Sequence, residues 1–286
     1  MRLKALFALI ALPFALHLFQ LFFLHYDGKF ATKIFSHGFE KTYSQEVSGL
    51  DFEKLDEILS QPFHQLGQGK QMIAFVSADD KYVIKFFNPS RPLKKNWYRS
   101  GKYWQRYSSF KWISREWFGK KQRLQKLFFR HKLAYELLKE ETGLVFVHLC
   151  PSKRICHLIS VTDKFGEEHR FCLAKTPFVL QKKAQLVSSY LHQLMQENQV
   201  TQAKQALARI EALFEKRLEV GITDRIQTME NNYGFVDGKP IQIDVGRIRY
   251  DPNLNLKEEK ARILSNFHNW IGSNYDHLLA NSEKGK

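Results

Sequence analysis

Residues 220–247 of the chain read VGITDRIQTMENNYGFVDGKPIQIDVGR. The pair Asp237-Gly238 is typical of a two-residue hairpin turn, because both positions of such a turn need positive φ angles. Apolar segments lie on either side of this pair, at 233–236 and 240–243. The stretch therefore predicts a β-hairpin whose two strands are joined by a tight turn.

Polar side chains lie at the open end of this predicted hairpin. Asn231 and Asn232 precede its first strand, and Asp244 begins an Asp-Val-Gly sequence that ends its second strand. Amide and carboxylate oxygens are ligands for Mg²⁺, and a hairpin holds two such ligands on adjacent strand ends. The alternative is an ordinary hairpin in which these polar residues only end the strands.

A second stretch, Leu66–Phe87, reads LGQGKQMIAFVSADDKYVIKFF and predicts another hairpin. Asp79-Asp80 lies between two apolar runs and is typical of a turn. Gly67 and Gly69 precede the first run, and glycines allow backbone N–H groups to approach a phosphate closely. Lys85 lies in the second run, where a side chain that points inward would add a positive charge for the same phosphates.

The order of these features resembles that of the protein-kinase-like fold. A helix is expected at 123–141, and helical structure across 185–219 with a break near 197–199. A hinge-like link between the two lobes is expected at 181–183. The resemblance spans Leu66 to Arg247 and implies ATP and Mg²⁺ as ligands. It implies that Gly67, Gly69 and Lys85 contact the phosphates, and that Glu136 orients Lys85, with Glu140 and Glu141 as rivals. The resemblance further implies that Asp224 is the catalytic base. The implied Mg²⁺ ligands are Asn231, Asn232 and Asp244.

The chain also departs from the pattern of the kinase-like fold. The base of the family lies five residues before the metal-binding asparagine, whereas Asp224 lies seven residues before Asn231. The third glycine expected in the first turn is Met72. Only 42 residues follow Asp244, too few for the large helical lobe with which protein kinases bind peptides. A small-molecule or lipid-linked hydroxyl is therefore the expected acceptor, and a catalytically inactive pseudokinase is the alternative.

The amino-acid composition indicates which classes of binding partner the protein favours. The 286 residues carry a net charge of +15, which favours acidic surfaces, anionic lipid or nucleic acid. Between Arg91 and Lys132 there are 14 Lys or Arg residues, one acid and four of the five tryptophans. Cationic and aromatic side chains in alternation are typical of membrane interfaces. Anionic lipid is therefore the expected partner of this segment, ahead of a packed structural insert and of single-stranded nucleic acid.

The N-terminal residues Ala5–Leu24 are uncharged and mostly Leu, Phe, Ala and Ile. About 20 apolar residues span a bilayer, so this run predicts an uncleaved transmembrane anchor. A cleaved signal peptide and a buried helix are the alternatives. The expected localisation is a single-pass membrane protein whose remaining chain faces the cytoplasm, where nucleotide is available.

Three cysteines and three histidines lie between 148 and 172. Their spacing matches no common zinc site and includes no Cys-x-x-Cys pair, so small buried core residues are the simpler interpretation. An odd number of cysteines also argues against a disulfide framework. Whether this group binds a metal stays open at the level of sequence.

The predicted fold class is α+β, a two-lobed kinase-like fold with an N-terminal transmembrane helix. The predicted parts are an anchor (1–25), a juxtamembrane helical region (26–60), an N-lobe (61–183) with a basic aromatic insert (88–122), and a reduced C-lobe (184–286). The expected function is ATP and Mg²⁺ binding with phosphoryl transfer. The alternatives are a pseudokinase scaffold, or a basic module that binds membrane surfaces or nucleic acid without a nucleotide site.

Overall fold

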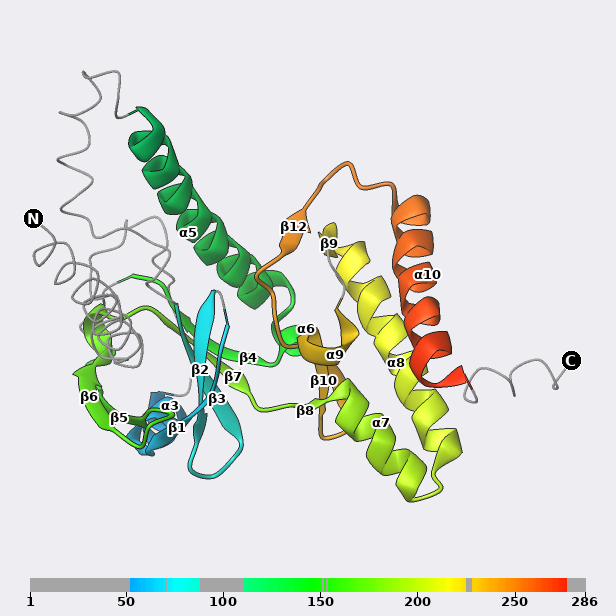
Figure 1. Cartoon of the computed structure of the whole chain (residues 1–286), viewed down its shortest axis with the longest axis horizontal. Helices are drawn as coiled ribbons and strands as arrows, with labels where there is room; N and C mark the ends of the chain where they lie inside the picture. The colour runs from blue at the N-terminus through cyan, green and yellow to red at the C-terminus, as the bar shows by residue number, and fades with distance from the viewer. Residues whose placement is uncertain are drawn as a thin grey trace, which may run out of the picture.

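The structure is a computed structural model that describes residues 52–69, 71–87, 111–150, 152, 154–224 and 228–276. Side chains are described throughout these ranges except at 111–123 and Lys175. The described chain mixes helices and strands. A strand-rich part holds β1–β7 with α3 and α5, and a helix-rich part holds α7, α8 and α10 (Figure 1).

Seven strands form one sheet in the order β4-β7-β3-β2-β1-β5-β6. All neighbouring pairs are antiparallel except β1 and β5, which are parallel. Short turns join β1 to β2, β2 to β3 and β5 to β6, so these neighbours in sequence are also neighbours in the sheet. The strands are β1 (Phe63–Gln68), β2 (Met72–Ser77), β3 (Tyr82–Phe87), β4 (Leu144–His148), β5 (Leu158–Thr162), β6 (Glu168–Cys172) and β7 (Phe178–Lys182).

Helices pack on both faces of this sheet. Helix α3 (Phe52–Ser60) buries Leu55, Ile58 and Leu59 in a core with Phe75, Phe86 and other strand residues. Helix α5 (Lys111–Leu137) lies on the opposite face, where Phe128 meets Phe87 edge to face at 4.6 Å. The short helix α6 (Lys139–Thr142) follows, and the 3₁₀ turn η3 (Leu173–Lys175) precedes β7.

The remaining elements form the helix-rich part and the connection to it. They are β8 (Gln185–Leu186), α7 (Val187–Gln196), α8 (Val200–Glu219), β9 (Ile222–Asp224), α9 (Met229–Asn232), β10 (Tyr233–Val236), β11 (Lys239–Gln242), β12 (Ile248–Tyr250) and α10 (Leu256–Asn274). Strands β11, β10 and β8 form one small sheet, and β12 pairs with β9 in another. Helices α7, α8 and α10 share a core with Tyr233 and Phe235 of β10.

The predicted hairpins and the helix break are confirmed. Asp237 and Gly238 have φ angles of 50° and 72° in the turn between β10 and β11, as a two-residue hairpin requires. Asp80, at 60°, lies in the turn between β2 and β3. Asn198, at 57°, lies between α7 and α8. At all three places, residues that tolerate positive φ specified the local geometry.

The predicted transmembrane helix is not retained. No helix in the described ranges is long and apolar enough to cross a membrane. Even the 27-residue helix α5 carries Lys and Arg along most of its length. The run Ala5–Leu24 lies outside the described residues, as does 88–110 of the basic aromatic segment. The fold class is corrected to a mixed helix-and-strand chain, and the assignment as a single-pass membrane protein is not supported.

Two glycines allow a matched test of the packing around the small sheet. A Cβ on Gly234 would lie 2.5 Å from the carbonyl oxygen of Gln185, on the strand paired with β10. A Cβ on Gly67 would meet nothing within 4 Å. We expect Gly234→Ala to lower the free energy of unfolding by about 1–3 kcal/mol through overpacking, measured by chemical denaturation. Gly67→Ala is the control and should be neutral or slightly stabilising. Equal effects of the two substitutions would contradict the close approach of β8 to β10.

Candidate functional site

Lys85 of β3 joins the large sheet to the segment that follows β11. Its Nζ donates a hydrogen bond of 2.8 Å to the carbonyl oxygen of Ile243. The next residue along the chain is Asp244, whose carboxylate interacts electrostatically with the same ammonium group. The structure therefore brings together two of the residues that the sequence predicts to share a site.

Burial sets the protonation behaviour of Lys85. Removal of the ammonium group from water lowers its pKa from 10.5 to about 8, although the negative charge of Asp244 acts in the opposite direction. Lys85 therefore carries its charge at pH 7 in a partly desolvated setting. A cation in such a place interacts strongly with an anionic ligand, because little water screens it.

Asp244 is half-buried, and one of its two carboxylate oxygens accepts a hydrogen bond from the protein. Its Oδ1 accepts a 2.7 Å hydrogen bond from the backbone N–H of Gly246. Oδ2 accepts no hydrogen bond from the described part of the chain. This second oxygen is the one that could bind a divalent cation.

Gly246 lies in close contact with the first turn of the large sheet. A Cβ at this position would overlap the side-chain oxygen of Gln71, which lies in the turn between β1 and β2. The carbonyl oxygen of Gly246 accepts a 2.5 Å hydrogen bond from Nη1 of Arg130 on α5. The glycine therefore lets the β1–β2 turn and helix α5 both approach the Asp-Val-Gly segment.

The predicted glycines lie in this turn, at Gly69, and in the strand that leads into it, at Gly67. The N–H of Gly69 donates a 2.8 Å hydrogen bond to the carbonyl oxygen of Met72, which closes the turn. Gly67 lies in β1 next to a local shift in the pairing with β2. Gln71 brings this turn close to the segment that carries Asp244. The N–H of Gly69, however, already donates to the carbonyl oxygen of Met72.

The structure does not bring Glu136 to Lys85. Glu136 is exposed on α5 and forms an ion pair of 3.7 Å with Lys132 on the same helix. Of its two rivals, Glu141 pairs with Lys216 of α8, and Glu140 is exposed.

His131 is the residue of α5 that faces Lys85 and Asp244. It is buried, its Nδ1 lies 2.8 Å from the carbonyl oxygen of Leu127, and it interacts electrostatically with both residues. Burial lowers its pKa from 6.5 to about 4. Its imidazole is therefore neutral at pH 7 and adds no charge that would repel Lys85.

Asp224 is fully buried at the end of β9. Its Oδ2 accepts a 2.8 Å hydrogen bond from Nε2 of Gln242, and its backbone carbonyl accepts one of 2.9 Å from Arg262 of α10. The same Gln242 nitrogen donates to the carbonyl oxygen of Asp244 at 3.1 Å. Gln242 thus links the predicted base to the predicted metal ligand through the interior of the protein.

A buried arginine extends this polar network. Nη1 of Arg217 on α8 donates to the hydroxyl of Tyr233 at 2.8 Å and to Oε1 of Gln242 at 3.1 Å. Its guanidinium also lies 5.4 Å from the ring centre of Phe214. Burial raises the pKa of Tyr233, so its hydroxyl stays protonated and can accept from Arg217. The network fixes the orientation of Gln242 and with it the carboxylate of Asp224.

The two predicted asparagine ligands differ in placement. The carbonyl oxygen of Asn232 accepts a 2.7 Å hydrogen bond from the N–H of Ile243, the residue before Asp244. Asn232 is half-buried, whereas Asn231 is exposed on the short helix α9. Asn232 is therefore anchored directly beside the segment that carries Asp244.

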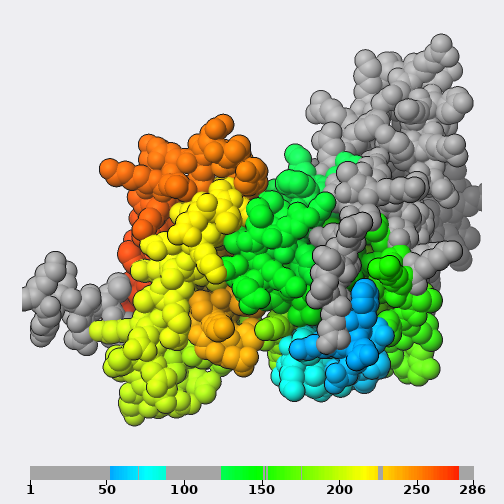
Figure 2. Space-filling view, turned by 180° about the vertical axis from the view of Figure 1, so that it is seen from behind, coloured from blue at the N-terminus to red at the C-terminus, as the bar shows by residue number. Residues whose placement is uncertain are grey.

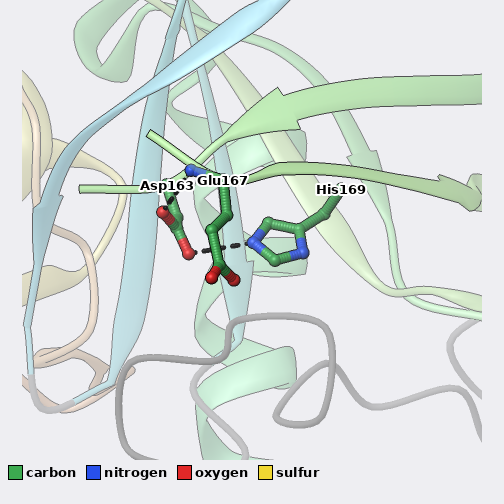
Figure 3. A group of neighbouring side chains, drawn as sticks. All are labelled: Asp163, Glu167 and His169. Atoms are coloured by element: carbon green, nitrogen blue, oxygen red, sulfur yellow. Dashed lines mark hydrogen bonds and ion pairs between the residues drawn. The ribbon is translucent and has the colours of Figure 1, made fainter. Parts of the chain in front are cut away.

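A separate group of possible metal ligands lies in the β5–β6 turn. The carboxylate of Asp163 accepts hydrogen bonds from the N–H groups of Phe165 and Glu167 and lies 2.9 Å from Nε2 of His169 (Figure 3). Burial of Asp163 would raise its pKa, but these hydrogen bonds and the charge of His169 lower it below its usual value. Both carboxylate oxygens of Asp163 have partners in the protein. These contacts close the β5–β6 turn, which accounts for the proximity of the three side chains.

The predicted cysteine and histidine cluster does not assemble as a metal site in the described part of the chain. No group of three close metal-ligating side chains there includes a cysteine. Cys150, Cys156 and Cys172 are free thiols, and the last two are exposed. The interpretation of these cysteines as buried core residues is wrong for Cys156 and Cys172.

Comparison with known proteins gives no relative from which a function could be inferred. No protein-family model matches the chain, and no curated protein gives a significant match. The interpretation of the site therefore rests on its geometry.

The buried charge of Lys85 predicts a pH-dependent stability. A lowered folded-state pKa means that the unfolded chain binds more protons between about pH 8 and 10.5, so this group raises stability as the pH rises through that window. We expect Lys85→Met to remove this rise, because no titratable group remains at position 85. Urea denaturation at several pH values measures the free energy of unfolding across this window.

Lys81→Met is the matched control, because Lys81 is exposed in the turn before β3. It should leave the pH dependence of stability unchanged. A stability profile in Lys85→Met that parallels the wild type above pH 8 would contradict the burial of this charge.

Proposed function

We propose that this protein binds a nucleoside triphosphate, ATP, together with Mg²⁺, at the site formed by Lys85 and Asp244. The observation that carries the proposal is their convergence. Lys85 comes from the central part of the large sheet, and Asp244 follows a hairpin far along the chain. Yet Lys85 is hydrogen bonded to Ile243, which lies 158 positions away in sequence. Ile243 is the residue directly before Asp244.

The charges at this site suit a metal–phosphate complex. A triphosphate needs neutralisation by fixed cations and by a divalent ion, which in turn needs oxygen ligands from the protein. Lys85 supplies a partly desolvated cation, and Arg130 approaches the same segment from α5. Oδ2 of Asp244 would hold Mg²⁺, and Asn232, whose backbone is hydrogen bonded to Ile243, is the better placed of the two predicted asparagine ligands. Mg²⁺ held there would supply positive charge that neutralises the phosphates.

Nucleotide binding without phosphoryl transfer is the form of this function that the site favours. A general base must reach the hydroxyl whose proton it takes. The carboxylate of Asp224 is instead fully buried and engaged by Gln242. This position supports a structural role for Asp224, so we propose the pseudokinase alternative ahead of a small-molecule kinase.

The binding proposal predicts ligand-induced stabilisation. A ligand that binds only the folded state raises the melting temperature, so ATP with Mg²⁺ should produce a saturable shift that ATP without metal produces only weakly. Lys85→Met and Asp244→Asn should each abolish the shift. Differential scanning fluorimetry, followed by calorimetric titration, measures these effects.

Asp237→Asn is a matched control on the same hairpin, because Asn also adopts the positive φ that position 237 requires. It should keep the full thermal shift. The binding proposal fails if the wild type shows no shift with any nucleotide and metal, or if Asp244→Asn retains the shift of the wild type.

The proposed absence of phosphoryl transfer is tested by ATP consumption. We expect the purified protein to hydrolyse ATP no faster than Lys85→Met does, with or without a panel of small-molecule hydroxyl acceptors. Asp224→Asn should keep the thermal shift given by Mg-ATP, because Asp224 lies within the polar network of Gln242. Turnover in the wild type that disappears in Asp224→Asn would contradict this part of the proposal and restore the kinase alternative.

A further inference from the structure

A hollow lies away from Lys85 and Asp244, where α3, the α6–β4 junction, the end of β7 and the β10–β11 turn meet. Its volume is about 330 Å³. Figure 2 shows the face on which these segments come together, with α3 and β3 in blue and cyan, α6 and β4 in green, and the hairpin in orange. The hollow shares no lining residue with the proposed nucleotide site.

The inner wall of this hollow is apolar. Four of its aliphatic side chains are almost completely buried, with 2–3 % of their surface exposed: Leu55, Ile58, Leu144 and Ile241. Gly143 lies directly against Ile241, since a Cβ at position 143 would lie 2.9 Å from Cδ1 of Ile241. The wall is therefore formed by side chains that the fold itself holds in place.

The outer edge of the hollow is predominantly cationic. Its charged side chains are four lysines and two acids, a net charge of +2: Lys54, Lys139, Lys182, Lys239, Glu140 and Asp237. Lys182 and Lys239 form no ion pair within the described residues, and Lys139 contacts the ring of Tyr135 at 5.0 Å. These lysines line the pocket beside its apolar wall, so an anion bound there would lie near several positive charges.

We propose that this hollow, named here the lysine-rimmed pocket, binds a small organic anion with an apolar body, such as an aromatic carboxylate, sulfonate or phosphate ester. The apolar wall accepts the body of the ligand, and Lys182 and Lys239 bind its anionic group. The volume lies at the lower end of the range for small-molecule sites. It suits one compact ligand, whereas an acidic peptide would need a longer groove.

Two fluorescent probes of nearly equal shape separate the two parts of this recognition. Anilinonaphthalene sulfonate carries an apolar body and one anionic group, and phenylnaphthylamine is the same body without the charge. The intact protein should bind the sulfonate saturably, with a dissociation constant about tenfold lower than that of phenylnaphthylamine. Equal affinities, or no saturable binding of the sulfonate, would overturn the proposal.

Charge reversal locates the anionic group of the probe. The double variant Lys182→Glu and Lys239→Glu should weaken binding of the sulfonate by about tenfold or more, while its affinity for phenylnaphthylamine stays within about twofold. Lys126→Glu with Lys257→Glu makes the same change in net charge at exposed positions outside the pocket. An equal loss in this control pair, or unchanged sulfonate binding in the pocket variant, would overturn the assignment.

A third variant tests the apolar wall. Val145 lines the pocket and is only partly buried, so Val145→Phe fills space without insertion into the tightly packed interior. It should weaken both probes, because the volume that receives their shared rings is reduced. Binding of both probes at wild-type affinity by a folded Val145→Phe protein, checked by circular dichroism, would contradict the proposed location.

Discussion

The hydrogen bond from Lys85 to the carbonyl oxygen of Ile243 joins the two parts of this protein at the point where its candidate chemistry is concentrated. An ammonium group can be removed from water only if an acceptor and a counter-charge replace part of its hydration. Ile243 supplies the acceptor and Asp244 the counter-charge. The hairpin therefore ends beside β3, and this contact helps to hold the helix-rich part against the large sheet.

The interior behind that contact is unusually polar. Arg217, Tyr233, Gln242 and Asp224 form a connected set of buried hydrogen bonds between α8, β9 and the hairpin. Loss of one hydrogen-bond partner leaves a buried polar group unsatisfied, which costs about 1–3 kcal/mol. The network therefore tolerates few arrangements of Gln242, and it holds the end of β11 in a defined position. That rigidity suits a segment that presents Asp244 to a ligand.

Local sequence rules predicted the parts of the fold that depend on local geometry. The Asp237-Gly238 turn, the Asp80 turn and the break at Asn198 all depend on residues that tolerate positive φ. These residues act within a few positions of themselves, so no knowledge of distant contacts is needed. The convergence of Lys85 and Asp244 followed from the order of the motifs, once the two hairpins were recognised.

Glu136 and Asp224 were assigned roles from the sequence that their positions in the structure do not support. Leu127, His131, Ala134 and Leu138 follow the spacing of one buried helix face, and Glu136 falls outside that spacing. The periodicity of α5 could thus have identified His131 as the inward residue, in place of Glu136. The burial of Asp224 had no such signal. It depends on the pairing of β9 with β12, and on Gln242 from a third segment, neither of which is encoded near position 224.

Strand β11 connects the two candidate binding regions, and its alternation of side chains explains how one short strand serves both. Ile241 lies against Gly143 in the wall of the lysine-rimmed pocket, Gln242 turns into the polar network, and the carbonyl oxygen of Ile243 accepts from Lys85. Successive side chains of a strand point to opposite faces, so neighbouring residues contact different surroundings. Ile243 follows directly after the last residue of β11, so the placement of this strand also sets the position of the acceptor of Lys85. Consecutive residues 241–243 thus contribute to both regions, and contacts on both faces of the strand hold them in place.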